Sequence, residues 1–163
     1  MEYKLLEEKE LELMENVLND DNMIFNIDYI KNFIQNENTY GFIAKEKDKL
    51  VGFAYGYTLL RPDGKTMFYL HSIGMLSKYQ DKGYGTSLLS FIKEYSRKMG
   101  CSKMFIITDK GNSRACHVYE KLGGKNDYED EIVYVYDYEK GDNLKQVWQN
   151  DCRIQKSVRK DVK

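Results

Sequence analysis

A loop with two glycines, between a strand-like run and a helix-like run, constrains this chain more than any other feature. The run Met67–Met75 is apolar and rich in aromatic residues, which is typical of a buried strand. From Thr86 to Met99, apolar residues recur at helical spacing. The loop between them, Gln80–Gly85, has the sequence Gln-Asp-Lys-Gly-Tyr-Gly. This order of elements predicts a turn in which the backbone can approach a ligand closely.

The chemistry of the loop favours a bound anion such as pyrophosphate. The first N–H groups of a helix have no partner inside the helix, and the positive end of its dipole attracts negative charge. Gly83 and Gly85 leave room for the anion, and Lys82 adds a mobile positive charge. The Walker phosphate loop is excluded because no lysine separates the second glycine from Thr86. The dinucleotide fingerprint is excluded because its third glycine is missing.

Two motifs carry a family resemblance. The loop resembles Gln/Arg-x-x-Gly-x-Gly/Ala, the acetyl-CoA signature of the GNAT family of N-acetyltransferases. The segment from Asn112 to Gly124 resembles that family's Asn-x-x-Ala-x-x-x-Tyr-x-x-x-Gly-Phe, with Gly124 where phenylalanine is usual. The two motifs occur in the family's order, separated by one expected helix and one expected strand. The chain is therefore identified as a member of this family over roughly residues 1–138.

The order of elements predicts an α/β (α+β) fold. We expect strands at 3–7, 39–46, 50–60, 67–75, 103–108 and 131–138, and helices at 8–18, 28–35, 86–99 and 113–122. Asp28 is the expected cap of its helix. Antiparallel strands first and a βαβ crossover later indicate a mixed sheet with helices on both faces. The resemblance implies in addition a splayed strand pair.

Composition narrows the organisation and the setting. With 163 residues and one proline, the chain fits a single domain, 1–140, followed by a basic tail, 141–163. We expect a helix from Asn143 that packs on the domain or on a second subunit, as in a homodimer; a frayed end is the alternative. Mixed charges with a net charge of −1 disfavour nucleic-acid binding. The absence of a long apolar run argues against a membrane span. The three cysteines are odd in number and widely spaced, with no C-x-x-C pair. This pattern favours a reducing cytoplasm and disfavours a metal site.

The resemblance also implies how acetyl-CoA is bound. The co-substrate would lie across the end of the 67–75 strand, where the amide of Met75, or of Gly74 or Leu76, polarises the thioester carbonyl. Gly74 is the expected bulge that opens the strand pair, and close packing is the alternative reason for a glycine there. Asn112 and Ser113 could bind the pantetheine arm, although helix capping would explain them equally well. The expected cofactor-binding residues are Met75, Leu76, Gln80, Asp81, Lys82, Gly83, Tyr84, Gly85, Thr86, Asn112 and Ser113.

Two residues are the expected catalysts. Tyr119 matches the family's motif tyrosine, which protonates the departing thiolate; a packing role is the alternative. His71 lies on the expected central strand, and its neighbourhood resembles that of arylalkylamine acetyltransferases, in which a histidine works as a base through water. A histidine side chain suits that task because it ordinarily titrates near neutral pH. A structural histidine is the alternative, and His117 is expected to face solvent.

The acceptor is an amine, and several classes remain open. The stretch from Leu60 to Gly85 resembles the aminoglycoside 3-N-acetyltransferase branch, but Ser72 stands where that branch has aspartate. An acidic cluster after the second motif could hold a polycation, or could be solvated loop charge: Asp127, Glu129, Asp130 and Glu131. We expect a small-molecule acceptor, either polyamine-like or an aminoglycoside. Peptide or protein amino groups, a non-catalytic acetyl-CoA sensor and a partner-binding domain are the alternatives.

Overall fold

The structure is a computed structural model that describes residues 1–20, 24–126 and 133–136. Residues Met1–Lys125 form one compact unit and Asn126–Lys163 a second. In the second unit, the described residues 133–136 are exposed and lie in neither a helix nor a strand, so the strand expected at 131–138 is absent from these four. The rest of that strand, the acidic cluster, the 140/141 boundary and the expected tail helix lie outside the described residues.

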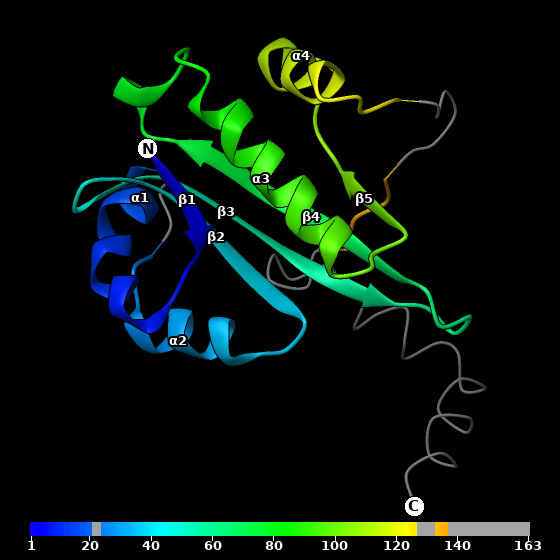
Figure 1. Cartoon of the computed structure of the whole chain (residues 1–163), viewed down its shortest axis with the longest axis horizontal. Coiled ribbons are helices and arrows are strands. Elements are labelled where there is room, and N and C mark those ends of the chain that lie inside the picture. Colours follow the sequence, from blue (N-terminus) through cyan, green and yellow to red (C-terminus); the bar gives the residue numbers. More distant parts are fainter. Residues whose placement is uncertain (21–23, 127–132, 137–163) are drawn as a thin grey trace, which may run out of the picture. The chain divides into compact units, whose positions relative to one another are not determined.

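Five strands form one mixed sheet within the described part of the chain, in the order β1-β2-β3-β4-β5 (Figure 1). From β1 to β4, each strand runs antiparallel to the next, whereas β5 runs parallel to β4. This arrangement confirms the predicted mixed sheet with antiparallel N-terminal strands. The strands are β1 (Glu2–Leu5), β2 (Thr39–Glu46), β3 (Lys49–Leu60), β4 (Thr66–Met75) and β5 (Lys103–Ile106).

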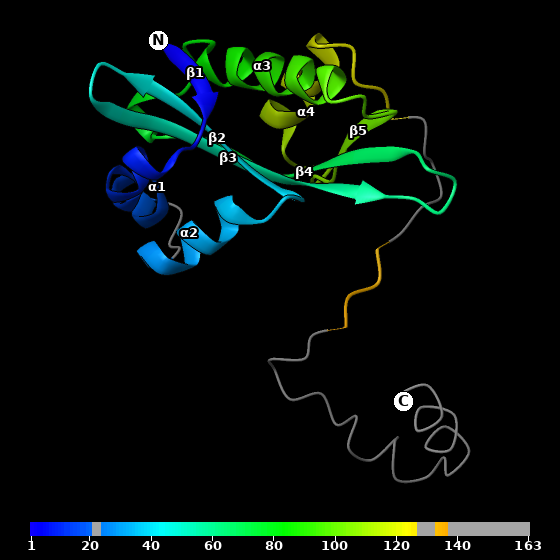
Figure 2. The ribbon, with the colours of Figure 1, turned by 60° about the horizontal axis from the view of Figure 1, so that its bottom comes forward.

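Helices cover both faces of the sheet, as predicted. Figure 2 shows α3 and α4 on one face and α1 and α2 on the other. The helical segments are η1 (Glu8–Met14), α1 (Glu15–Asp20), α2 (Ile27–Gln35), η2 (Ser77–Tyr79), α3 (Tyr84–Lys98) and α4 (Ser113–Lys121). The predicted cap of α2 was wrong. Asn26, rather than Asp28, caps this helix, because the Asn26 side-chain oxygen accepts hydrogen bonds from the backbone N–H groups of Asp28 and Tyr29.

Strand alternation divides the apolar side chains between two cores. On the α3 face, fully buried rings and aliphatic chains include Phe42, Phe68, Leu70, Leu88 and Ile92. On the opposite face, the second core joins the sheet to the N-terminal helices through residues that include Leu11, Met14, Ile43 and Leu50. Because successive strand residues point to opposite faces, neighbours such as Phe42 and Ile43 enter different cores. The two cores hold the sheet rigid from both sides.

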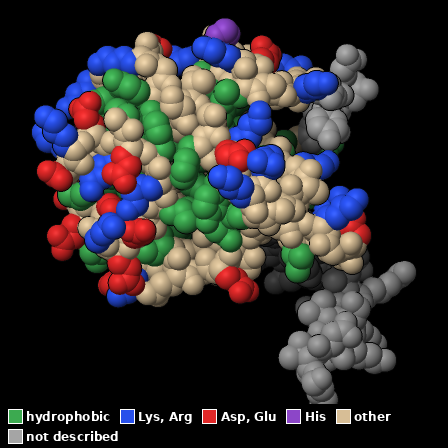
Figure 3. Space-filling model, in the orientation of Figure 1, with side chains coloured by type: hydrophobic (Ala, Val, Ile, Leu, Met, Phe, Trp, Pro, Cys, Tyr) green, Lys and Arg blue, Asp and Glu red, His purple; other side chains and the backbone are tan. Residues whose placement is uncertain are grey.

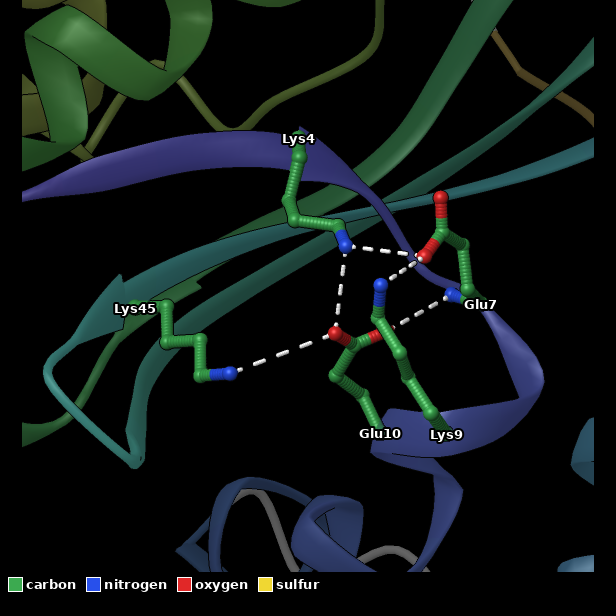
Figure 4. Close-up of polar contacts among 5 residues, drawn as sticks. All are labelled: Lys4, Glu7, Lys9, Glu10 and Lys45. Carbon is green, nitrogen blue, oxygen red and sulfur yellow. Dashed lines mark hydrogen bonds and ion pairs between the residues drawn. The ribbon is translucent and has the colours of Figure 1, made fainter.

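A buried carboxylate ties the N-terminal helical segment to the sheet (Figure 4). Glu10 is 1% exposed and accepts hydrogen bonds from Lys4 Nζ at 3.1 Å and from the Glu7 backbone N–H at 3.2 Å. Lys45 Nζ lies 4.0 Å from the same carboxylate. Contacts with Lys9 first and Lys4 second lower the pKa of Glu7 to about 2. The hydrogen bond to Glu7 is in turn the largest cause of a raised pKa at Lys4. The cluster fixes η1 against β1 and β2.

The surface of the described residues carries mixed charge. Figure 3 shows acidic and basic side chains interspersed over one face, with hydrophobic side chains gathered across its middle. Among the described residues, no helix has both the length and the apolar composition that a membrane crossing requires.

Candidate active site

The sheet opens halfway along β4. Parallel pairing with β5 runs from Met67 opposite Lys103 to Leu70 opposite Ile106 and stops there. Beyond that point β4 continues to Met75 with β3 as its partner. The last residues of β4 therefore line a gap that a ligand can enter, as expected for a splayed strand pair.

The bulge in β4 lies at His71, so the prediction of a bulge at Gly74 was wrong. Tyr55 pairs with Ser72 and Gly56 with Leu70, which leaves His71 as the extra residue with no register partner in either neighbouring strand. Gly74 pairs regularly with Phe53. A bulge leaves its extra residue outside the ladder and bends the strand. The chain thus places an exposed histidine where β5 departs.

The glycine loop leads into α3, as predicted, but the helix begins at Tyr84, two residues before the predicted start. Gly83 is the N-cap residue and has a φ of +79°, a left-handed conformation that glycine adopts without strain. The first hydrogen bond of the helix runs from the Ser87 N–H to the Gly83 carbonyl at 3.0 Å. The backbone N–H groups of Tyr84, Gly85 and Thr86 precede it, and no acceptor is recorded for them within the described residues. These three amides can hold an anion.

A chain of side-chain contacts braces this loop against α4. Gln80 Nε2 donates to the Met75 carbonyl at 2.9 Å, and Arg114 Nη1 donates to Gln80 Oε1 at 2.6 Å. Arg114 Nε also lies 3.6 Å from the Asp81 carboxylate. Sequence reasoning missed Arg114, because nothing in the motif distinguishes it from other exposed helix arginines. Its position balances the negative charge of Asp81 beside the anion site.

Two residues that were expected to bind the cofactor, Leu76 and Lys82, make other contacts in the structure. The Leu76 N–H already donates to the Val51 carbonyl at 2.9 Å, and the Leu76 side chain packs against the core on the opposite face. Leu76 is therefore removed from the set. Lys82 Nζ donates to the Lys78 carbonyl at 2.8 Å and lies 5.7 Å from the centre of the Tyr79 ring. The Lys82 ammonium group is thus folded onto its own loop.

Helix α4 places Tyr119 beside the gap. The side chain is half-buried, and burial first and Cys116 second raise its pKa above the ordinary tyrosine value of 10.0. The phenol therefore keeps its proton at neutral pH and can donate it. Asn112 caps α4, because its side-chain oxygen accepts from the Ala115 N–H at 3.2 Å. A Cβ at Gly124 would lie 2.9 Å from the Tyr119 carbonyl oxygen, so a side chain at this position would require the backbone here to shift.

Most of the predicted site residues, but not all, meet in one cleft of about 350 Å³. Gly83, Gly85 and Thr86 from the start of α3 and Tyr119 of α4 all line it, together with apolar side chains from β4, α3 and α4. Such a cleft can hold a long ligand with an anionic head and present a proton donor to its tail. The residues that line it are Ile73, Gly74, Met75, Gln80, Asp81, Gly83, Gly85, Thr86, Leu89, Asn112, Arg114, Ala115, Val118 and Tyr119. Sequence reasoning did not assign Ile73, Leu89 and Val118 to the cleft, because their apolar side chains resemble those of ordinary core residues. Of the predicted site residues, His71, Tyr84 and Ser113 do not line the cleft.

Other chemistries find little support in the described part of the chain. Within it, no group of three or more histidine, cysteine or acidic side chains could hold a metal ion. The Cys116 thiol lies 3.9 Å from the Asp109 carbonyl, and no base contacts it among the described residues. His117 is exposed on α4, as predicted.

Comparison with known proteins agrees with this geometry. The sequence model of the Acetyltransferase (GNAT) family matches residues 5–124. An uncharacterized N-acetyltransferase, YhfO of Bacillus subtilis (strain 168), is 27% identical over 109 residues, which span 66% of this chain and 70% of that protein.

Solved structures share the fold. An aminoglycoside acetyltransferase from an uncultured soil metagenomic sample superposes with a TM-score of 0.69 at 23% identity, over 83% of this chain and 94% of that one. A ribosomal-protein-alanine N-acetyltransferase from Brucella melitensis biovar Abortus 2308 superposes with a TM-score of 0.67 at 17% identity, over 82% of this chain and 98% of that one.

Proposed function

Because this chain belongs to the acetyltransferase (GNAT) family, whose members use acetyl-CoA, we propose that it transfers the acetyl group directly to a primary amine within a ternary complex. The observation that carries the proposal is the cleft itself. It joins the free amides at the start of α3 to the protonated phenol of Tyr119.

The cleft residues fit acetyl-CoA. The amides of Gly85 and Thr86 offer donors to the pyrophosphate, and Gly83 places no side chain above them. Between these amides and Tyr119, apolar residues such as Leu89 line a path for the pantetheine arm. Gly74 lies two residues before Leu76 in the same antiparallel ladder, so its N–H also points toward β3. At the gap, the amide of Met75 would therefore donate to the thioester oxygen. One preorganised donor of this kind is typically worth about 3 kcal/mol.

Transfer needs two proton movements. The amine nitrogen forms a bond to the thioester carbon while the carbon–sulfur bond breaks. The amine proton passes to His71, directly or through one water, and Tyr119 gives its proton to the departing sulfur. A primary amine with a pKa near 10 is only about one part in a thousand free base at pH 7, which makes a base valuable.

The acceptor we propose is a small amine, polyamine-like or an aminoglycoside. Its support is a resemblance of the Leu60–Gly85 stretch to the aminoglycoside branch and a shared fold with aminoglycoside acetyltransferases. Against it, Ser72 stands where that branch has aspartate. A peptide amino group is the second candidate, favoured by the shared fold with a ribosomal-protein-alanine N-acetyltransferase.

Binding and turnover test the proposal in sequence. Isothermal titration with acetyl-CoA should show binding, and Gly83→Asp should abolish it by placing a negative charge over the helix amides. Gly83→Asn is the matched neutral control, because asparagine has a similar size and tolerates a positive φ. Equal loss in both variants would indicate backbone strain in place of phosphate repulsion.

Thiol release with a panel of amines then separates an enzyme from an acetyl-CoA sensor. We expect release with at least one of spermidine, an aminoglycoside and an N-terminal peptide. Binding of acetyl-CoA without thiol release for any amine would favour the sensor.

A further inference from the structure

An aromatic layer surrounds His71 on the side of the sheet that carries α2. The His71 ring centre lies 5.0 Å from that of Tyr55, 6.1 Å from that of Tyr57 and 5.5 Å from that of Tyr69. Tyr57 and Tyr69 contact it edge-on, at interplanar angles of 83° and 89°. Ring pairs at these distances attract one another and favour a fixed relative orientation. The imidazole of the bulge is thus held on three sides.

One polar contact adds direction to this packing. His71 Nδ1 lies 3.1 Å from the Tyr69 hydroxyl oxygen, which is hydrogen-bond distance. Of the two imidazole nitrogens, this contact engages Nδ1 and leaves Nε2 as the one that can meet a substrate. In a neutral imidazole, the hydrogen bond that one ring nitrogen makes determines which of the two nitrogens carries the proton.

Tyr69 is itself anchored in the part of β4 that is paired on both sides. Its ring stacks on Phe105 of β5 at 5.0 Å and on Tyr57 of β3 at 6.2 Å, at interplanar angles of 16° and 23°. The neighbouring strands therefore fix the phenol, whereas His71 lies at the bulge and pairs with neither strand. Because Tyr69 is fixed by both neighbouring strands, it is suited to position the side chain of a residue whose backbone lies outside the ladder.

We infer that Tyr69 is a positioning residue for His71: its hydroxyl oxygen accepts the Nδ1–H of the imidazole and leaves Nε2 unprotonated to accept the amine proton. This inference rests on the proposed role of His71 as base. The Tyr69 hydroxyl and the His71 Nδ1–H keep their covalent bonds, and the only transfer is that of the amine proton to Nε2. A hydroxyl that donated to Nδ1 would instead place the proton on Nε2 and disable the base.

The surroundings of His71 make a tautomer readout meaningful. The titratable groups that face it are the phenols of Tyr55 and Tyr57 from β3 and of Tyr69 from β4. The Tyr69 hydroxyl lies within hydrogen-bond distance of His71 Nδ1 and can therefore bias its tautomer.

Tyr69→Phe in the full chain tests the inference, because it removes the hydroxyl and keeps the ring. Tyr57→Phe is the matched control, since Tyr57 touches the same imidazole through its ring and has no recorded hydrogen bond to it. Nitrogen-15 NMR of the imidazole should show the Nδ1–H tautomer in the wild type and in Tyr57→Phe. The Nε2–H tautomer should gain population in Tyr69→Phe.

Kinetics give the second readout. At neutral pH, Tyr69→Phe should lower kcat about five-fold, the usual effect of losing one neutral hydrogen bond, and leave the KM for acetyl-CoA unchanged. The loss should shrink at alkaline pH, where the amine is already free base. The thermal midpoint of unfolding should stay the same as in Tyr57→Phe.

Two results would overturn the inference. One is a wild-type imidazole protonated at Nε2; the other is a Tyr69→Phe variant that matches Tyr57→Phe in tautomer and rate. The NMR readout needs neither acetyl-CoA nor an acceptor. Failure of the proposed transfer reaction would therefore appear separately, as absent thiol release from a protein whose imidazole still shows the expected tautomer.

Discussion

The two halves of β4 differ in what holds them and in what they can do. From Thr66 to Leu70 the strand pairs with β3 on one side, and all but its first residue pairs with β5 on the other. From Ser72 to Met75 it pairs with β3 alone, and the unpaired His71 separates the halves. The first half buries Phe68 and Leu70 completely, whereas every residue of the second half keeps some exposure. One continuous strand thus supplies both a rigid support and an open edge.

The difference shows how a sheet can keep a reactive opening without losing stability. A lost strand partner exposes backbone groups that must find water or a ligand. Here the loss begins only after the fully buried residues have been passed, so the core is unaffected. Substitutions of the fully buried residues in the first half should change folding, and substitutions of residues that face the gap should change chemistry.

The largest expected effect lies in the first half. Phe68→Ala removes a fully buried ring and should lower the free energy of unfolding by about 3–5 kcal/mol. Chemical denaturation measures this change. Ser72→Ala, across the bulge, is the control and should cost less than about 1 kcal/mol. Similar costs for the two variants would contradict the division of β4.

Tyr119→Phe should have the next largest effect, on turnover. We expect kcat to fall about 100-fold with unchanged acetyl-CoA affinity, because the variant lacks the proton for the departing sulfur. Burial raises the pKa of Tyr119, so the wild type should lose activity only above the ordinary tyrosine range of about 10. The pH profile of kcat should lack this alkaline fall in the variant. Unchanged turnover would assign Tyr119 to packing.

His71→Ala should produce a loss of similar size at acidic pH that shrinks as the pH rises. Near pH 6.5 the amine is almost wholly protonated, and we expect a fall of about 100-fold in kcat/KM. Near pH 10 the amine is largely free base and the loss should shrink to a few-fold. His117→Ala, an exposed histidine on α4, is the control and should leave the profile unchanged. A loss that is constant across pH would return His71 to a structural role.

Two glycine variants on β3 compare the halves of β4 by the effect of adding one methyl group beside each. A Cβ at Gly56 would collide with the Tyr69 carbonyl and lie 2.8 Å from the Phe68 ring, both fixed in the first half, so Gly56→Ala should cost about 1–3 kcal/mol in unfolding. A Cβ at Gly52 would chiefly meet the flexible end of Met75 and should cost under about 1 kcal/mol. Because Met75 lines the cleft, Gly52→Ala should instead weaken acetyl-CoA binding. Thermal unfolding and calorimetry separate the two effects.

Local sequence patterns were enough to identify the family and to locate most of the helices and strands. Two motifs in the right order identified the family, and apolar periodicity located the strands from β1 to β5 and the helices α3 and α4. Gly83 and Asn112 were found because helix starts follow local rules of backbone and capping chemistry. These features depend on residues close together in the chain, so a sequence displays them directly.

The position of the bulge and the contacts of some site residues depend on groups far apart in the chain, and these became visible only in the folded structure. The bulge lies at His71 instead of Gly74 because Leu70 and Ile73 both pack against the same core, which requires two residues between them. Leu76 lost its expected role because the Val51 carbonyl, on another strand, claims its N–H. Arg114 gained one because Gln80, distant in sequence, lies within reach. Pairing between distant residues depends on which groups the fold brings together, and local sequence patterns do not record that.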